Sequence, residues 1–346
     1  MNPARPVPPG ALTAPLAQDA EAARAFADAA RAPNTLRAYR ADWADFLAWC
    51  ADRRVQPLPA TTETVALYIA ARARPDAESP PLAVSTLARR LAAISQAHKI
   101  AGYESPASRQ REPLHSVWRG VVRERGEAPR KVAPTLTPEI TAMVEAIPTT
   151  PPGDRPADRA LARRGKRDRA ILLLGFAAAL RRSELAAIQV QDAAATPDGL
   201  RLWIPRSKTD QRGAGAVLGV AFGRHPATCP VRAFQSWIRA AEDARGRALD
   251  GPAFRAVDRW GNVAAKPLAS HSIARIVKAR AAAAGLDPSL YSGHSLRAGF
   301  ATQAARNGTP DRTIMRHTRH QSLQTLNEYV REGRLFDGNP SAHLGL

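Results

Sequence analysis

The stretch RDRAILLLGFAAALRRSELAAI, residues 167–188, decides the fold. Its centre, residues 171–180, is apolar on every side of a helix, whereas a surface helix has a single apolar stripe. The sequence therefore predicts a central, buried helix around which a domain is built. We expect this helix to stop at the polar residues 181–184, RRSE. Two arginines at the mouth of a buried helix need a partner, because an uncompensated buried charge is costly.

The chain has 346 residues, which suits two domains that each have a core. Its formal net charge of +19 and its pI near 11.2 are extreme for that length. Nucleic acid or an anionic membrane surface would both match such a charge. Arginine supplies 44 of the 50 basic residues. Coding bias can explain arginine in place of lysine, but it does not explain the excess of base over acid.

Targeting signals and paired cysteines are absent from the sequence. No apolar run approaches the roughly 18 residues of a spanning helix, and the N-terminus lacks a signal-peptide core. We therefore expect a cytoplasmic, nucleoid-associated protein with no membrane partner. Cys50 and Cys229 lie far apart without CxxC spacing, so neither a disulfide framework nor a zinc site is indicated. Both cysteines are expected to be buried small hydrophobes.

The first third of the chain predicts a small helical domain. Residues 1–17 are rich in Pro and Ala without periodicity, which is typical of a flexible tail. Residues 18–126 carry apolar side chains at steps of three and four, which indicates amphipathic helices. These helices are expected at residues 18–31, at 34–50, from Thr61 or Thr62, from 85 with Ser85 as the cap, and at 113–123. The charged stretch RERGEAPRKVAP ends this domain, and we place a linker at residues 127–135.

Four arginines on the predicted helices are candidates for contact with DNA, on its backbone or in a groove. They are Arg37, Arg40, Arg89 and Arg90. We expect them on exposed faces. Any single one of them is as often a solvated surface residue as a DNA contact.

The second predicted domain, residues 136–332, mixes helices with a small antiparallel β-sheet. Strand-like pieces occur at residues 188–191, 202–205 and 216–221. The polar loop SKTDQRGAG joins the last two pieces and presents Lys208. Helices are expected at residues 229–245 and 270–284, and the latter offers Ser270, His271, Arg275 and Lys278 outward. The fold class is therefore mainly α with a small antiparallel sheet, and residues 333–346 are expected to be a tail or an arm.

The stretch SGHSLRAGFATQAARNGTPDRTIMRHTRHQSLQTLNEYVR, residues 292–331, gathers polar groups beside little acid. His294 and Arg297 lie three residues apart on one helical face, and His320 and Tyr329 lie nine apart. The guanidinium presents a planar fork of donors that suits phosphate oxygens. A tyrosine phenol is a potential nucleophile once a base or a strong field assists it. We therefore suspect a phosphate diester as the substrate.

Six residues in this order resemble the active site of the tyrosine recombinase (phage integrase) family, and of its Cre-like members in particular. They are Arg181, Lys208, His294, Arg297, His320 and Tyr329. The resemblance covers roughly residues 30–332 and is most specific in the blocks ALRRSEL, SGHSLRAG and HQSLQTLNEYVR. It implies a helical, SAM-like N-terminal core-binding domain and a mixed α+β catalytic domain that form a C-shaped clamp on duplex DNA.

The resemblance also implies the chemical roles. Arg181 and Arg297 would clamp the scissile phosphate and stabilise the charge of its transition state. Tyr329 would attack phosphorus and leave a 3′-phosphotyrosyl link, which stores the energy for rejoining, so that neither metal nor ATP is needed.

Three further groups would assist this reaction. Lys208 would protonate the leaving 5′-oxygen, His294 would act as acid or base, and His320 would donate to the phosphate. Glu184 resembles the acidic position that orders the site, and we consider it a supporting residue.

The implied partners are duplex DNA with inverted-repeat half-sites and further copies of this chain. A dimer would occupy one site and a tetramer would form in synapsis. Base reading would come from the four arginines of the first domain and from Ser270, His271 and Arg275 of the second. In relatives, a C-terminal helix packs on a neighbouring copy. The segment after Tyr329 is short, so the sequence leaves open whether this chain has such a helix.

Rival interpretations remain open at this level. A type IB topoisomerase shares the same chemistry, and a non-catalytic DNA-binding protein can keep the fold. A lone tyrosine or histidine is more often structural than catalytic, and only the joint occurrence of all six residues argues otherwise. His317 and His320 lie three apart, but no cysteine is near them, so we do not expect zinc. We expect no metal and no cofactor.

Overall fold

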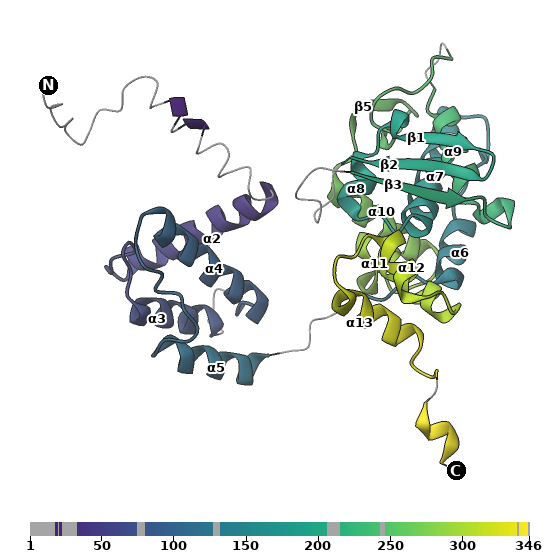
Figure 1. Cartoon of the computed structure of the whole chain (residues 1–346). Helices are drawn as coiled ribbons and strands as arrows, with labels where there is room; N and C mark the ends of the chain where they lie inside the picture. The colour runs from purple at the N-terminus through teal and green to yellow at the C-terminus, as the bar shows by residue number, and fades with distance from the viewer. Residues whose placement is uncertain are drawn as a thin grey trace, which may run out of the picture. The chain divides into compact units, whose positions relative to one another are not determined.

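The structure is a computed structural model, and it divides the chain into two compact units (Figure 1). They are an N-terminal unit, Met1–Arg130, and a C-terminal unit, Lys131–Leu346. The residues described are 18–19, 21–22, 33–74, 80–126, 132–205, 215–242, 246–337 and 339–344. The predicted tail at residues 1–17, Lys208 and most of the predicted linker lie outside these ranges.

The N-terminal unit contains helices α2 (Pro33–Asp52), α3 (Thr62–Ala73), α4 (Val84–Ile100) and α5 (Leu114–Arg125). Their apolar stripes meet in one core in which Phe46, Tyr68, Leu87 and Ile94 are fully buried. The rings of Phe46 and Tyr68 meet edge to face with centroids 5.0 Å apart. The predicted helix start at Thr61 or Thr62 is confirmed, since α3 begins at Thr62, and the Thr61 hydroxyl caps it.

The predicted cap at Ser85 is wrong. Helix α4 already begins at Val84, and its N-cap is Ala83, which makes no side-chain cap hydrogen bond. Ser85 therefore lies in the first turn, where its side chain is exposed.

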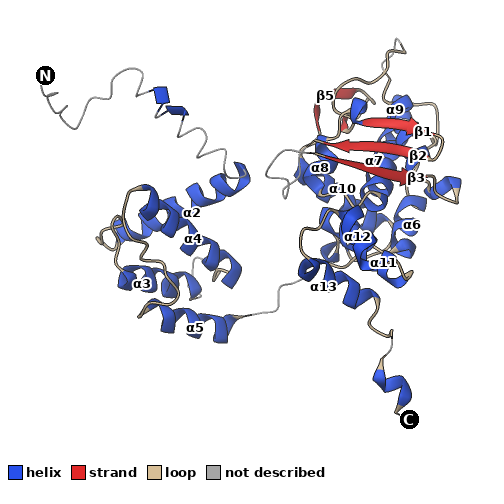
Figure 2. Ribbon diagram, in the orientation of Figure 1, coloured by secondary structure: helices blue, strands red, loops and turns tan. Residues whose placement is uncertain are grey.

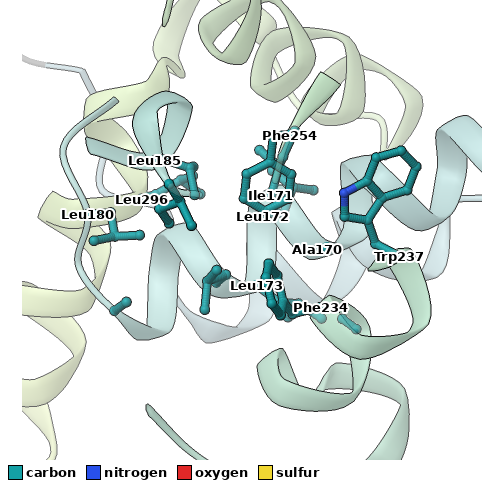
Figure 3. Close-up of a cluster of buried hydrophobic side chains, with 14 of the residues drawn as sticks. Ala170, Ile171, Leu172, Leu173, Leu180, Leu185, Phe234, Trp237, Phe254 and Leu296 are labelled. Atoms are coloured by element: carbon teal, nitrogen blue, oxygen red, sulfur yellow. The ribbon is translucent and has the colours of Figure 1, made fainter. Parts of the chain in front are cut away.

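The C-terminal unit is built around helix α7 (Pro156–Ala177), which carries the apolar run that decides the fold. Residues 170–174 of α7 are at most 3% exposed, as predicted for a central helix. Figure 3 shows this run packed against Phe234 and Trp237 of α9 (Pro230–Ala240) and against Leu185 and Leu296. The Trp237 indole donates to the Ala253 carbonyl at 2.7 Å, which satisfies its polar group in the core.

The predicted end of this helix is wrong by several residues. Helix α7 stops at Ala177, and Ala179 adopts a left-handed conformation with φ 47°. The chain then reverses, and a short helix α8 (Arg182–Ala187) begins with Arg181 as its N-cap. An apolar run shows where burial occurs, but it does not show where a left-handed residue breaks the helix.

A three-stranded antiparallel sheet, in the order β1-β2-β3, lies beside these helices (Figure 2). Its strands are β1 (Ala193–Thr196), β2 (Gly199–Ile204) and β3 (Ala216–Ala221). The predicted strands at 202–205 and 216–221 are confirmed within a few residues, and Leu202 pairs with Leu218. The predicted strand at 188–191 is wrong. That segment holds one isolated bridge, from Gln189 to Pro252, and the start of a 3₁₀ turn (Val190–Asp192).

The remaining elements complete the unit. Helix α10 (Ser270–Ala283) follows the predicted segment 270–284. The other helices are α6 (Thr137–Glu145), α11 (Gly293–Arg306), α12 (Asp311–Thr318) and α13 (Leu323–Gly333). A hairpin of β4 (Arg255–Val257) and β5 (Val263–Pro267) was not predicted, and α9 is shorter than the predicted 229–245. Short 3₁₀ turns lie at Pro226–Thr228, Pro288–Leu290 and Pro340–His343. No helix in the described part is both long and apolar enough to cross a membrane.

Candidate active site

Three segments of the C-terminal unit converge on one site: the α7–α8 turn, α11, and the α12–α13 region. They bring together Arg181, His294, Arg297, His320 and Tyr329, which are five of the six predicted catalytic residues. The sixth, Lys208, lies outside the described residues.

Arg181 is positioned by Glu184 one turn later. The Arg181 backbone N–H donates to Glu184 Oε2 at 2.8 Å, and its Nη1 donates to Oε1 at 2.7 Å. Glu184 is 4% exposed. Burial raises the pKa of this carboxyl, but the Arg319 charge and the hydrogen bonds and charge of Arg181 outweigh it and lower the pKa. The carboxylate is therefore ionised and supplies the partner of Arg181, the first of the two arginines at the helix mouth.

Arg297 is almost completely buried, at 2% exposure, in α11. Its Nη1 donates to the Ala179 carbonyl at 2.7 Å, and its Nη2 is buried without a partner among the described residues. Burial and then the Arg181 charge lower the pKa of Arg297 to about 9. Arg297 stays cationic at neutral pH and retains an unused donor.

His294 and Tyr329 form the central hydrogen bond of the site. His294 Nε2 and the Tyr329 hydroxyl lie 2.8 Å apart. Ser292 caps α11 by accepting from the His294 N–H, which fixes the start of this helix. Partial burial and the charges of Arg297 and Arg181 lower the pKa of His294. A neutral imidazole at this distance can take the phenol proton.

His320 also lies beside the tyrosine. The rings of His320 and Tyr329 stack with centroids 6.1 Å apart. Thr318 Oγ1 lies 2.8 Å from His320 Nδ1. Burial first, and then the charges of Arg297 and Arg181, lower the pKa of His320 to about 3, so this ring is neutral at physiological pH.

Two residues that the sequence reasoning missed complete the site. Thr318 is fully buried beneath His320, and Arg319 donates to Glu184 Oε2 at 2.7 Å. Arg319 has a left-handed backbone with φ 56° and ψ 43°. The only sign of Arg319 in the sequence was its position directly before His320. Being next to a catalytic candidate does not indicate that a side chain points inward.

The candidate DNA-contacting arginines of the N-terminal unit separate into two kinds. Arg37 and Arg40 are exposed on α2. Arg89 remains partly exposed but donates to Asp42 at 2.7 Å and 3.1 Å. The expectation of an exposed Arg90 is wrong, because its side chain is 13% exposed and pairs with Asp45.

Candidates on α10 lie as predicted on its outer face. His271 and Arg275 are exposed, and Ser270 is half-buried at the first residue of the helix. Lys278 continues the same exposed row.

His317, one of the two histidines that lie three apart in the sequence, contacts the end of α7 and a ring of α11. His317 Nε2 lies 2.9 Å from the Ala177 carbonyl, and its ring stacks on Phe300 at 4.5 Å. No group of three or more His, Cys, Asp or Glu side chains that could hold a metal ion occurs in the described part of the chain. His317 therefore has a structural role in joining α12 to the end of α7.

Two family models match the chain. The phage integrase family model matches residues 157–334, and the model of the phage integrase N-terminal SAM-like domain matches residues 25–104. An integrase/recombinase xerD homolog of Selenomonas ruminantium is 36% identical over 310 residues, which covers 89% of this chain and 84% of that protein. A tyrosine recombinase of Synechococcus elongatus is 29% identical over 323 residues, covering 91% and 89%.

Solved structures agree with the fold. A XerH site-specific recombinase bound to palindromic difH substrate gives a TM-score of 0.54 at 15% identity, covering 82% of this chain and 72% of that one. The Tn1549 transposon integrase in complex with transposon right end DNA gives 0.51 at 14% identity, covering 83% and 86%.

A protein with this fold and this cluster of His, Arg and Tyr side chains belongs to the class of tyrosine recombinases. The catalytic family model spans more than half of the sequence, and the chain belongs to the phage integrase family. The family predicted from the motifs is confirmed, as is the mainly helical fold with a SAM-like N-terminal domain.

Proposed function

We propose that this protein is a site-specific DNA recombinase that cleaves and rejoins duplex DNA through a 3′-phosphotyrosyl intermediate. The observation that carries this proposal is the 2.8 Å contact between His294 Nε2 and the Tyr329 hydroxyl, with Arg181 and Arg297 beside it. A nucleophile, a neutral base and two fixed cations are the parts that phosphoryl transfer requires.

In the proposed cleavage step, the Tyr329 oxygen forms a bond to phosphorus while the bond from phosphorus to the 5′-oxygen breaks. The phenol proton passes to His294. The 5′-oxygen leaves with a proton, which we assign to Lys208 as general acid. One phosphate ester replaces another, so the reverse attack by a 5′-hydroxyl rejoins the strand and restores the free tyrosine.

Arg181 and Arg297 would stabilise the charge that builds on the non-bridging oxygens. Arg297 Nη2 supports this role, because it is a buried donor without a partner among the described residues. His320 would add a third donor through its Nε2, in the tautomer whose Nδ1 accepts from the Thr318 hydroxyl. Glu184 would hold Arg181 in place. This reaction proceeds without metal or ATP.

The partners follow from charge and from the family. We propose that both units contact duplex DNA in the nucleoid, forming a clamp around a site with inverted half-sites. A dimer on each site and a tetramer in synapsis would bring four active sites together, because two duplexes must each be cut on both strands. Arg37, Arg40, His271 and Arg275 are the exposed candidates for DNA contact.

A type IB topoisomerase would use the same chemistry on one duplex. The match of the N-terminal unit to the SAM-like domain of phage integrases argues against this alternative. Strand exchange between two duplexes at one sequence would separate the two activities.

The nucleophile can be tested with the variant Tyr329→Phe. The DNA target site would first be identified by selecting the duplexes that the protein binds from a random pool. Inverted repeats beside the gene would be tested as further candidate sites. On a nicked suicide substrate we expect the wild-type chain to form a covalent complex, and Tyr329→Phe to bind the DNA equally well without forming one. A covalent complex in the variant would exclude Tyr329 as the nucleophile.

A further inference from the structure

Arg319 occupies a backbone conformation that its residue type rarely adopts. It follows α12 as the C-cap with φ 56° and ψ 43°, and left-handed backbone is disfavoured for residues with a Cβ. Strained residues persist where surrounding interactions hold them, and they cluster at functional sites. We therefore expect specific interactions to hold this arginine in place.

The side chain of Arg319 turns inward. It is 11% exposed, its Nη2 donates to Glu184 Oε2 at 2.7 Å, and its Nη1 donates to the His317 carbonyl at 3.3 Å. Its Nε is buried without a partner among the described residues. Burying a guanidinium in this way is unfavourable unless the carboxylate compensates it.

Glu184 is bound from both sides. Its Oε2 accepts from the Arg181 backbone N–H and from Arg319, and its Oε1 accepts from Arg181 Nη1. One carboxylate thus joins the start of α8 to the segment directly before His320, 135 residues further along the chain.

We propose that Arg319 is a positioning residue for strand cleavage, which acts through Glu184 to hold His320 and Arg181 in register around the scissile phosphate. This inference rests on the proposed recombinase function. Arg319 does not touch the phosphate in this scheme. It fixes the distance between two groups that do.

Packing elsewhere already holds the α12–α13 region in the fold. Ile314, Leu326 and Val330 are buried together with residues of α11. Arg334 donates to Asp311 at 2.8 Å. Removing the Arg319 side chain therefore leaves the region folded and changes chiefly how closely the segment before His320 is tied to α8.

The variant Arg319→Gly separates the backbone from the charge, because glycine accepts the left-handed conformation without strain. We expect a melting temperature equal to or above that of the wild type, DNA binding within about threefold, and single-turnover covalent complex formation slowed by roughly tenfold or more. Arg319→Asn, which also tolerates this backbone, should behave alike. Arg319→Lys should recover part of the rate. Arg316→Gly, an exposed position on the same helix, controls for general loosening of α12.

A double-mutant cycle with Glu184→Gln tests the route of action. If Arg319 acts through Glu184, the rate loss of the double variant is well below the product of the two single losses. The proposal would be overturned if the rate loss of the double variant equalled the product of the two single losses. It would also be overturned if Arg319→Gly cleaved at the wild-type rate. Failure of the wild-type chain to form any covalent complex would instead refute the recombinase function itself.

Discussion

One buried carboxylate stands among three guanidiniums at the candidate active site. Glu184 binds Arg181 and Arg319, while Arg297 is held by a backbone carbonyl. Burial, together with the surplus positive charge, lowers the pKa values of both histidines beside Tyr329. The site is thus arranged so that its cations await an anionic phosphate while its imidazoles remain neutral.

The hydroxyl of Thr318 contacts one ring nitrogen of His320. It lies 2.8 Å from His320 Nδ1 and 2.8 Å from the Ile314 carbonyl. Thr318→Val keeps the branched shape but removes this partner, so the His320 ring loses its fixed orientation. We expect covalent complex formation to slow roughly tenfold at unchanged DNA affinity, since orientation dominates such steps. Thr318→Ser should stay close to the wild-type rate, and an equal loss in both variants would contradict the role of the hydroxyl.

The depressed pKa of His320 predicts a pH-dependent stability. Between its folded pKa of about 3 and the unfolded value of roughly 6.5, the unfolded chain binds a proton that the folded chain does not. The free energy of unfolding of the DNA-free protein should therefore decrease as the pH falls below about 6.5. His320→Gln should reduce this slope by up to about 1.4 kcal/mol per pH unit in denaturant titrations.

His294 and His317 titrate in the same direction, because burial lowers both of their pKa values. The difference between the His320→Gln slope and the wild-type slope is therefore the informative quantity. Identical slopes would show that His320 is protonated equally in both states.

The sequence revealed the residues that carry chemistry better than the residues that support them. Arg181, His294, Arg297, His320 and Tyr329 could be named because their types and order match a known family. Supporting contacts depend on backbone geometry, so neither the inward turn of Arg319 nor the ion pair of Arg90 could be predicted.

At the scale of elements, the helix that carries Tyr329 packs closely against the helix that carries Arg297. A Cβ on Gly333, at the end of α13, would lie 2.6 Å from the Thr302 carbonyl oxygen and 2.9 Å from the Ala305 Cβ. Only the absence of a side chain permits this approach. The position of the nucleophile therefore depends on a glycine one turn beyond it.

Gly333→Ala should displace α13 and with it Tyr329. We expect covalent complex formation to fall roughly ten- to a hundredfold on a suicide substrate, because small misplacements of a reacting group are costly. DNA affinity should be retained. Gly120→Ala in α5, where a Cβ meets nothing within 4 Å, is the control and should leave cleavage unchanged.

Helices were more predictable than strands. The 3.6-residue periodicity located α2, α3 and α10 closely. Strand β1, with the sequence AAAT, carries no alternating apolar pattern, and β4 is three residues long. These strands form because partners far along the chain pair with them, and a local pattern cannot indicate such pairing.

At the scale of the whole molecule, the net charge of +19 predicts binding that is steeply sensitive to salt. Arg40 is exposed on α2, whereas Arg53, the first residue after that helix, is paired with Asp52 at 2.7 Å. We expect Arg40→Gln to reduce the slope of log affinity against log salt by about 0.9, which is one phosphate contact. Fluorescence anisotropy on a half-site duplex measures this slope. Arg53→Gln should not alter it, and equal slopes for all three proteins would place α2 away from the phosphates.

The end of helix α7 contributes a further property to the site. The carbonyl of Ala177, its last residue, lies 2.9 Å from a ring nitrogen of His317, and the carbonyl of Ala179, two residues beyond the helix, accepts from Arg297. The C-terminus of a helix carries a partial negative charge of roughly half an electron, the macrodipole. This counter-charge does not titrate and cannot be displaced by the substrate. The longest buried helix of the unit thus acts as a permanent dipole that stabilises Arg297 without occupying the donor that a phosphate needs.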